Sequence, residues 1–174
     1  TYQVVFLSLS ISLFASQIGL LVVLLSVILR RVSQFAIPIL STKVLNFFML
    51  TRDLLVTVQL IVFDFDGVFT DNTVYVTENG VESVRCWRSD GLGLARLSTV
   101  GVQAFIISTE ANPVVTVRAK KLKLPCKQGV NDKADGVLTT CRELQIEPRN
   151  TMFVGNDIND IPAFKLVGLP ICVA

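Results

Sequence analysis

Acidic, hydroxyl, amide and ammonium side chains occur at four places in the chain. They are Asp64 and Asp66, Ser108 and Thr109, Lys133, and Asn156, Asp157 and Asp160. Two carboxylates as close as Asp64 and Asp66 repel each other unless a cation lies between them. Oxygen ligands favour Mg²⁺ as that cation. The Ser108 hydroxyl and the Lys133 ammonium group would supply the hydrogen-bond donor and the positive charge that a phosphate needs.

The composition excludes several other chemistries. The chain has 174 residues and no histidine, so a Ser-His-Asp triad, a histidine base and a zinc site with imidazole ligands are all excluded. Its four cysteines, Cys86, Cys126, Cys141 and Cys172, form no CxxC pair and are typical of reduced core residues in a cytosolic protein. No basic patch with interleaved aromatic residues indicates nucleic-acid binding.

The elements that must position these residues alternate between strand and helix. Short apolar runs at 60–65, 103–107, 151–154 and 169–173 predict buried parallel strands, and helical patterns occur at 91–100, 112–122, 132–144 and 157–167. This alternation predicts an α/β fold, a Rossmann-like doubly wound parallel sheet. Ligands bind at the carboxyl ends of strands in such sheets, so the polar residues should converge at one edge.

One segment interrupts the alternation. Residues 73–87 form two alternating stretches around Asn79-Gly80, a pair that strongly favours a type I′ hairpin turn. We interpret the segment as a β-hairpin flap at the mouth of the site. An ordinary hairpin at the edge of the sheet is the alternative.

Residues 1–57 form an apolar leader that differs from the rest of the chain. Residues 4–29 contain no charged side chain and exceed the roughly 20 residues that cross a bilayer core. Basic residues follow this run, so a transmembrane helix there would place the following domain in the cytoplasm. The alternative is that the leader is a non-native extension. Residues 58–174 form the second domain, which we expect to be truncated at its C-terminus.

The four motifs resemble those of the haloacid dehalogenase superfamily of phosphotransferases. The matching pattern is Asp64-x-Asp66-Gly-Val, Ser108, Lys133 and Gly155-Asn-Asp-x-x-Asp160, and the resemblance covers residues 58–174. The stretches RSDGLG at 88–93 and QGVNDK at 128–133, the hairpin and the absence of a cap insertion resemble the 3-deoxy-D-manno-octulosonate 8-phosphate phosphatase branch. That branch includes nonulosonate 9-phosphate phosphatases and the similar domain fused to acylneuraminate cytidylyltransferases.

The resemblance implies a role for each motif residue. Asp64 would be the nucleophile that forms an aspartyl-phosphate, and Asp66 the general acid and then the base. Phosphate would be held by Ser108, Thr109 and Lys133, and Mg²⁺ by Asp64, Asp66 and Asn156. Asp157 and Asp160 would support these groups, while Asp90, Gly91 and Glu110 would contact the substrate or the flap. Asp90, Asp132 and Asp157 could instead be helix N-caps, and Asn159 a simple turn residue.

Two departures from the family pattern leave two functions open. Asn156 stands where the family usually has an aspartate, and this substitution predicts weaker metal binding. At position 110, the glutamate is similar to the residue of the nonulosonate enzymes. The first function is a Mg²⁺-dependent phosphatase acting on an eight- or nine-carbon sugar acid phosphate. The second is a weakly active or inactive oligomerising C-terminal module of an acylneuraminate cytidylyltransferase. The resemblance to capless members of the family implies a homotetramer in which one subunit's hairpin closes a neighbour's site. We expect this assembly for both functions.

Overall fold

The apolar runs of the sequence form the strands of a parallel sheet in the computed structural model, which describes residues 55–173. The strands are β1 (Leu60–Phe63), β4 (Gln103–Ile107), β5 (Cys126–Lys127), β6 (Thr151–Gly155) and β7 (Leu169–Cys172). Their order is β5-β4-β1-β6-β7, and every neighbouring pair is parallel. The predicted α/β fold is confirmed, with β1 at the centre of the sheet.

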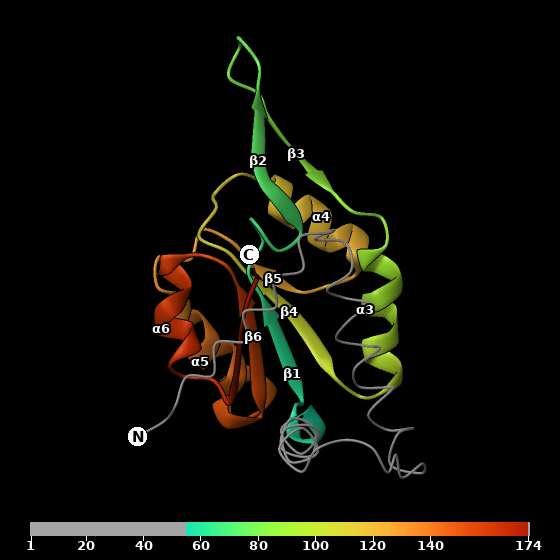
Figure 1. Ribbon diagram of the computed structural model, residues 1–174, viewed down its shortest axis with the longest axis vertical. Helices are drawn as coiled ribbons and strands as arrows, with labels where there is room; N and C mark the ends of the chain where they lie inside the picture. Colours follow the sequence, from blue (N-terminus) through green and yellow to red (C-terminus); the bar gives the residue numbers. More distant parts are fainter. Residues whose placement is uncertain (1–54, 174) are drawn as a thin grey trace, which may run out of the picture.

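Helices cover both faces of this sheet (Figure 1). They are α3 (Asp90–Thr99), α4 (Val114–Leu122), α5 (Lys133–Leu144) and α6 (Ile161–Phe164), with 3-10 turns η2 (Pro148–Asn150) and η3 (Ile158–Asp160). Alternate side chains of β1 enter two cores. Ile61 and Phe63 belong to the core formed with α3 and α4, whereas Leu60 and Val62 belong to the core formed with α5 and α6. A central strand buried on both faces explains the continuous apolar run.

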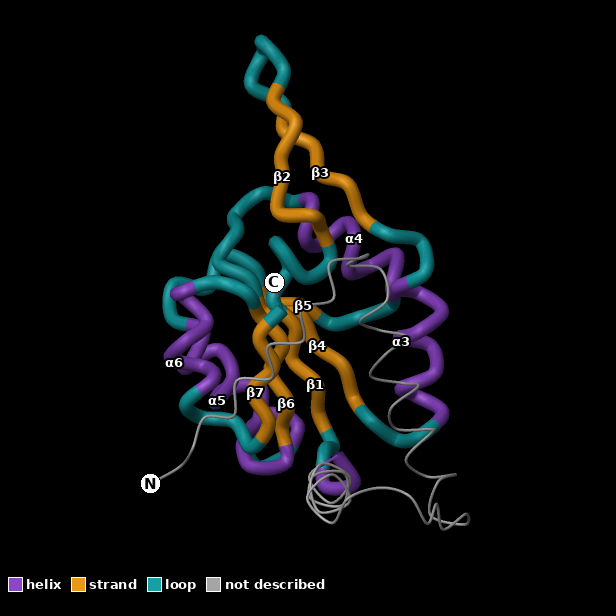
Figure 2. Tube along the Cα trace, viewed as in Figure 1, coloured by secondary structure: helices purple, strands orange, loops and turns teal. Residues whose placement is uncertain are grey.

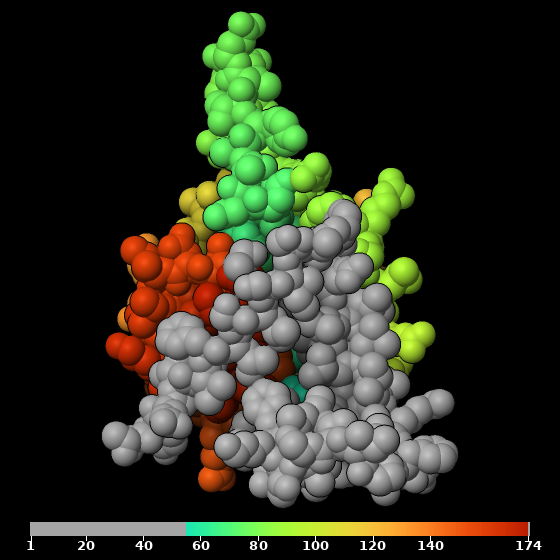
Figure 3. Space-filling model, viewed as in Figure 1, coloured from blue at the N-terminus to red at the C-terminus, as the bar shows by residue number. Residues whose placement is uncertain are grey.

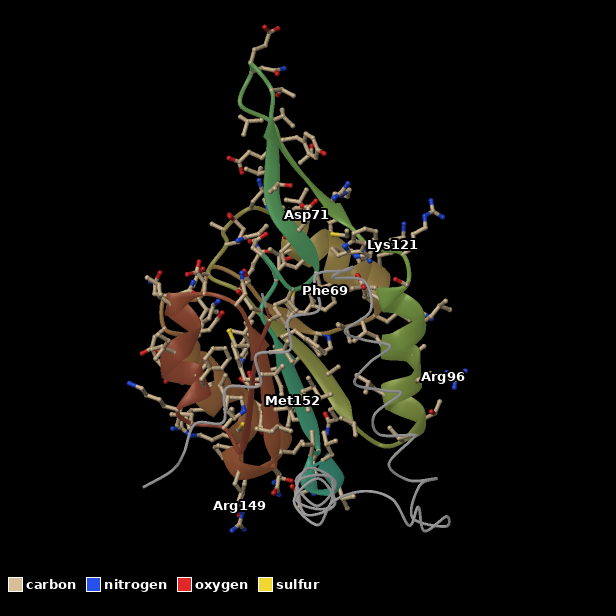
Figure 4. All side chains as sticks on the ribbon, viewed as in Figure 1. Phe69, Asp71, Arg96, Lys121, Arg149 and Met152 are labelled. Carbon is tan, nitrogen blue, oxygen red and sulfur yellow. The ribbon has the colours of Figure 1, made fainter. Side chains whose placement is uncertain are left out.

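The predicted hairpin is present and projects beyond the carboxyl edge of the sheet (Figures 1 and 3). It consists of β2 (Thr70–Val76) and β3 (Glu82–Cys86), which among residues 55–173 pair only with each other. At its base Phe69 packs edge-to-face on Phe63, with ring centroids 5.4 Å apart. Figure 4 shows Phe69 at this junction and Asp71 at the start of the hairpin.

The turn of the hairpin differs from the prediction. A type I′ turn needs positive φ at both central residues, but only Gly80 has one, at +79°, and Asn79 does not. Gly80 N donates to Thr77 O at 2.9 Å, and Thr77 N donates to Val81 O at 3.0 Å. This pattern fits the longer loop in which a type I turn is followed by a left-handed glycine in a G1 bulge. The type I′ prediction is therefore wrong.

Two further elements differ from the sequence-based expectation. The two-residue strand β5 was not predicted, and it extends the sheet beyond β4. The helix predicted over residues 157–167 is instead the turn η3 followed by the four-residue helix α6. Pro162 explains the break, because proline lacks an N–H and is tolerated only in the first turn of a helix. Figure 2 shows α6 beside α5.

The apolar leader falls almost wholly outside the described part of the chain, and so does the membrane span predicted over residues 4–29. Within residues 55–173, no helix has both the length and the apolar character needed to cross a bilayer.

Candidate active site

Lys133 lies at the centre of the candidate site. It is the first residue of α5, and its side chain is 1% exposed. Its ammonium nitrogen lies 2.9 Å from Asp64 Oδ1 and 2.6 Å from Asp160 Oδ1. The N-cap of α5 is Asp132, whose side chain accepts from the backbone N–H groups of Ala134 and Asp135. The N-cap interpretation of Asp132 is therefore confirmed, and the cap fixes the start of the helix that carries Lys133.

Asp160 connects Lys133 to the loop that follows β6. Its side chain is fully buried, and its second oxygen, Oδ2, accepts from the backbone N–H groups of Asn156 at 2.9 Å and Asp157 at 3.0 Å. Asp157 caps η3, and the two aspartates form a capping box, so the N-cap interpretation of Asp157 is confirmed as well. Asp160 therefore holds the loop and the lysine in one arrangement.

Asp64 directly follows β1. Like Asp160, it is buried, and only 5% of the residue is exposed. Its backbone N–H donates to Val154 O at 2.8 Å, which continues the pairing of β1 with β6. Burial raises the pKa of the Asp64 carboxyl from 3.8 to about 6, and the neighbouring Lys133 opposes this rise. The expected repulsion between Asp64 and Asp66 is thus relieved in part by a cation of the protein itself.

Asp66 lies at the base of the hairpin and is only half-buried. Thr70 Oγ1 donates to Asp66 Oδ1 at 3.4 Å and accepts from the N–H groups of Gly67 at 3.1 Å and Asn72 at 3.2 Å. Burial and the nearby Glu110 carboxylate raise the pKa of Asp66. The fully buried Thr70 therefore joins Asp66 to the first residues of β2.

Asn156 presents an amide oxygen that fits a metal ligand. Its Oδ1 is buried and has no hydrogen-bond partner among the described residues. The side chain lies against Gly67, where a Cβ would be 2.0 Å from Asn156 Nδ2, so only glycine fits next to it. Buried polar atoms without partners are rare in native proteins. In residues 55–173 no group of three His, Cys, Asp or Glu side chains suits a metal ion, so an oxygen such as this one would have to complete the set.

Ser108 and Thr109 follow β4 on the other side of the site. Ser108 is buried, and its Oγ accepts from the Glu110 N–H at 3.1 Å. Thr109 is exposed, and its Oγ1 accepts from Asn159 Nδ2 at 3.3 Å. The other end of the same amide, Asn159 Oδ1, accepts from Lys133 Nζ at 3.3 Å. Asn159 thus bridges the segment after β4 and Lys133.

A groove of about 320 Å³ lies next to Asp66, between the hairpin and the loop after β4. Its lining contains the carboxylates of Asp66, Glu82 and Glu110, together with the amides of Asn72 and Asn112. The groove is therefore acidic and rich in hydrogen-bonding groups. Glu110 Oε1 accepts from the Asn112 N–H at 2.7 Å, which fixes Glu110 in the lining.

Asp90 and Gly91 lie apart from this group. Asp90 begins α3 after the N-cap Ser89, so the N-cap interpretation of Asp90 is wrong. Its Oδ2 lies 3.2 Å from Arg118 Nη2 of α4, and both side chains are largely buried. At Gly91 the nearest atom to an added Cβ would be Leu122 Cδ2, at 3.7 Å. These residues join α3 to α4.

The sequence reasoning missed two side chains of the site. Thr70 carried no signal beyond its place four residues after Asp66. The sequence indicates only a simple turn residue at Asn159, although Asn159 directly precedes Asp160. Both act by bridging groups that the sequence pattern had identified, and bridges of this kind depend on side-chain geometry.

Comparison with known proteins gives relatives with the same architecture. A family model of haloacid dehalogenase-like hydrolases matches residues 126–174. The 3-deoxy-D-manno-octulosonate 8-phosphate phosphatase of Escherichia coli K12 is 30% identical over 118 residues, which are 67% of this chain and 63% of the relative. The chain thus spans less than two thirds of the length of this curated relative.

Solved structures agree with the sequence comparison. A Streptomyces avermitilis protein assigned to the haloacid dehalogenase (HAD) family of hydrolases is 45% identical, with 68% of each chain covered and a TM-score of 0.66. The Moraxella catarrhalis 3-deoxy-D-manno-octulosonate 8-phosphate phosphatase, solved with magnesium, phosphate and the sugar acid KDO, is 29% identical. Its match covers 64% of this chain and 65% of that one, with a TM-score of 0.61.

The Rossmann-like parallel sheet, the carboxylates after its central strand and these likenesses define a haloacid dehalogenase-type α/β domain. The chain belongs to the haloacid dehalogenase-like hydrolases, in the branch of the 3-deoxy-D-manno-octulosonate 8-phosphate phosphatases.

Proposed function

We propose that residues 58–174 form a Mg²⁺-dependent phosphatase that releases phosphate from an eight- or nine-carbon sugar acid phosphate. The observation that carries this proposal is the buried contact between Asp64 Oδ1 and Lys133 Nζ, 2.9 Å apart. This contact supports the proposal because the carboxylate that would act as the nucleophile lies beside the positive charge that a phosphate would need. Both groups lie at the carboxyl edge of the sheet, where ligands bind in this fold class.

Asp64 would attack phosphorus while the bond to the sugar oxygen breaks, and this step gives an aspartyl-phosphate. The attack needs the ionised carboxylate. The pKa of Asp64, about 6, leaves it mostly ionised at neutral pH, and the Lys133 ammonium group stabilises that form.

Asp66 would protonate the departing sugar alkoxide and then accept a proton from the water that hydrolyses the aspartyl-phosphate. The pKa of Asp66 is raised by burial and by Glu110, so the proton is held more strongly than on an ordinary aspartate. This shift favours a general acid over a second nucleophile. Thr70 would keep the Asp66 carboxylate in place.

Ser108, Thr109 and Lys133 would hold the nonbridging oxygens of the phosphate, because phosphoryl transfer depends mainly on positioning and charge stabilisation. Asp64, Asp66 and Asn156 would hold Mg²⁺. The ion would neutralise part of the charge on the phosphate and the carboxylates. The neutral amide of Asn156 predicts weaker metal binding than an aspartate would give.

The acidic groove supports a substrate with many hydroxyl groups. Asp66, Glu82 and Glu110 would accept hydrogen bonds from sugar hydroxyls, whereas they would repel the substrate carboxylate. The carboxylate should therefore lie outside the groove. A homotetramer, in which a neighbour's hairpin contacts this site, would bring further side chains to the mouth.

A cytoplasmic location is part of the proposal. Cys86, Cys126, Cys141 and Cys172 are all free. Free cysteines are typical of a reducing compartment.

Asn156 favours a second candidate function. If the neutral amide weakens metal binding too far, the domain would be an oligomerising module of an acylneuraminate cytidylyltransferase with little or no activity. The scaffold of the site would then be retained without turnover.

The test measures phosphate release from octulosonate 8-phosphate and nonulosonate 9-phosphates, with and without Mg²⁺. Asp64→Asn is the test variant, and Asp135→Asn, an exposed carboxylate on α5, is the matched control. We expect turnover that requires Mg²⁺, survives in Asp135→Asn and is lost in Asp64→Asn. A folded wild-type oligomer without turnover at saturating Mg²⁺ would support the second candidate.

A further inference from the structure

The Lys133 ammonium group has three oxygen partners in the structure, an ion pair with Asp64 and hydrogen bonds to Asp160 and Asn159. A lysine ammonium has three donors and no acceptor. The acceptors are Asp160 Oδ1 at 2.6 Å, Asp64 Oδ1 at 2.9 Å and Asn159 Oδ1 at 3.3 Å. A phosphate oxygen can therefore bind Lys133 only if one of these partners gives way.

The three partners differ in how easily they can be displaced. Asp160 is fully buried and also holds two backbone N–H groups, so its displacement would break the loop after β6. Asp64 is a buried carboxylate, and removing Lys133 from it would leave a charge without compensation. Asn159 makes the longest contact, carries no charge and is exposed, so water can replace Lys133 as its partner.

The position of the Asn159 amide is set from its other end. Its Nδ2 donates to Thr109 Oγ1 at 3.3 Å, which keeps Oδ1 directed to Lys133. Thr109 belongs to the segment that would bind phosphate beside Lys133. A phosphate that accepts from both Lys133 and the Thr109 hydroxyl would thus displace Asn159 Oδ1 from Lys133, while Thr109 Oγ1 can still accept from Asn159 Nδ2.

We propose that Asn159 is a positioning residue whose carboxamide occupies the third donor of Lys133 in the free enzyme and is exchanged for a phosphate oxygen when phosphate binds. The inference rests on the proposed function, because it takes Lys133 as a phosphate-binding group. Asn159 holds the lysine in place before binding and competes with the phosphate for one hydrogen bond.

The test is the dissociation constant of inorganic phosphate, measured by titration calorimetry at neutral pH and saturating Mg²⁺. The variants are Asn159→Ala, which removes the competing acceptor, and Asn159→Asp, which makes it a carboxylate. Asn150→Ala and Asn150→Asp, in η2 before the start of β6, are the matched controls. Circular dichroism establishes that each variant is folded.

We expect opposite effects from the two substitutions. Asn159→Ala should bind phosphate about two- to tenfold more tightly, since one neutral hydrogen bond no longer competes. Asn159→Asp should bind it at least about tenfold more weakly, because a charge-assisted bond holds Lys133 and the new carboxylate repels the phosphate. The Asn150 variants should match the wild type. A merely structural role of Asn159 could not tighten phosphate binding.

Weaker or unchanged binding in Asn159→Ala would overturn the proposal, and so would a wild type that binds no phosphate. The turnover assay separates this failure from that of the proposed function. An enzyme that hydrolyses the sugar acid phosphates while Asn159→Ala leaves phosphate affinity unchanged would disprove only the role of Asn159. If the wild type binds phosphate, the two Asn159 variants shift its affinity as expected and none of the substrates is hydrolysed, only the proposed function is disproved.

Discussion

The Lys133 ammonium group lies between the carboxylates of Asp64 and Asp160, and at the residue scale this arrangement determines the properties of the site. The lysine is 1% exposed, so neither it nor the two acids can rely on water for stabilisation. Removing one partner of a buried ion pair costs far more free energy of unfolding than removing one partner of an exposed pair. The residues of the site should therefore contribute to stability as well as to chemistry.

Asp64 should make the stability of the metal-free protein depend on pH. Its pKa is about 6 in the folded protein, against 3.8 ordinarily, so folding favours the protonated form. This contribution is complete below pH 3.8 and is lost as pH rises through about 6. The free energy of unfolding should fall by up to about 3 kcal/mol across that window relative to Asp64→Asn. Denaturant titrations at several pH values with a metal chelator measure it, and equal pH slopes in the two proteins would contradict it.

Asp160 and Asp157 should differ in their effects on stability, although both belong to one capping box. Asp160→Ala removes a buried partner of Lys133 and two backbone acceptor contacts, and should cost about 3–5 kcal/mol. Asp157→Ala removes an exposed cap and should cost about 1 kcal/mol. Chemical denaturation of both variants gives the comparison. Similar losses would show that the contact with Lys133 adds little.

Sequence reasoning could predict which residues gather at the site but not how they pair. Asp64, Ser108 and Asn156 follow strands, and the carboxyl ends of parallel strands meet at one edge. The contacts of Lys133 with Asp64 and Asp160 depend on how the first turn of α5 faces the loop after β6. Thr70 and Asn159 act through single side-chain hydrogen bonds, which no periodic pattern encodes.

At the scale of elements, the hairpin turn shows how a correct element can have an incorrect geometry. The Asn-Gly pair predicted the hairpin, because both residues are common in turns. The loop is one residue longer than expected, so Gly80 lies at the bulge and Asn79 has an ordinary φ. The loop length is set by the pairing of β2 with β3 and not by the Asn79-Gly80 dipeptide.

This geometry predicts unequal effects of substitutions at the two turn positions. Gly80→Ala places a side chain at φ +79° and should destabilise the hairpin by about 1–2 kcal/mol. No atom of the described part of the chain lies within 4 Å of an added Cβ at Gly80, so steric contact there would not contribute. Asn79→Ala should change little. Hydrogen exchange at the Thr77 and Gly80 amides measures the local opening, and equal acceleration in both variants would favour a type I′ turn.

The missed elements are the shortest ones. Strand β5 has two residues, too few to show any period, and only its pairing with β4 defines it. An apolar pattern predicted one helix over residues 157–167. The Asp157–Asp160 capping box instead stabilises the separate 3-10 turn η3 at the start of this segment. Helix α6 then begins at Ile161, with Pro162 in its first turn. Tertiary contacts and capping decided these elements, whereas the long buried strands were set by their apolar runs.

At the scale of the whole molecule, the projecting hairpin exposes apolar side chains. Val74, Tyr75 and Val76 are 52%, 61% and 62% exposed. Figure 3 shows the hairpin standing clear of the described body of the molecule. Apolar residues grouped on one element are typical of interaction surfaces.

The proposed homotetramer predicts that charges on the hairpin should disrupt assembly. Tyr75→Asp combined with Val76→Asp should reduce the molar mass measured by light scattering to that of a monomer, because carboxylates cannot be buried without a partner. Val117→Asp on α4, where the valine is 67% exposed, is the matched control and should leave the mass unchanged. A hairpin variant that keeps the wild-type mass would disprove hairpin-mediated assembly.

The central position of β1 has a consequence for the protein during its synthesis. Leu60 pairs with Gln103 of β4 and with Thr151 of β6, so β1 is translated long before its second neighbour. At ~5–20 residues per second, roughly 5 to 18 seconds separate the two. During that time an apolar strand with unpaired backbone groups is exposed on the ribosome. We expect the nascent chain to depend on chaperones until β6 emerges, and the active site cannot exist before then.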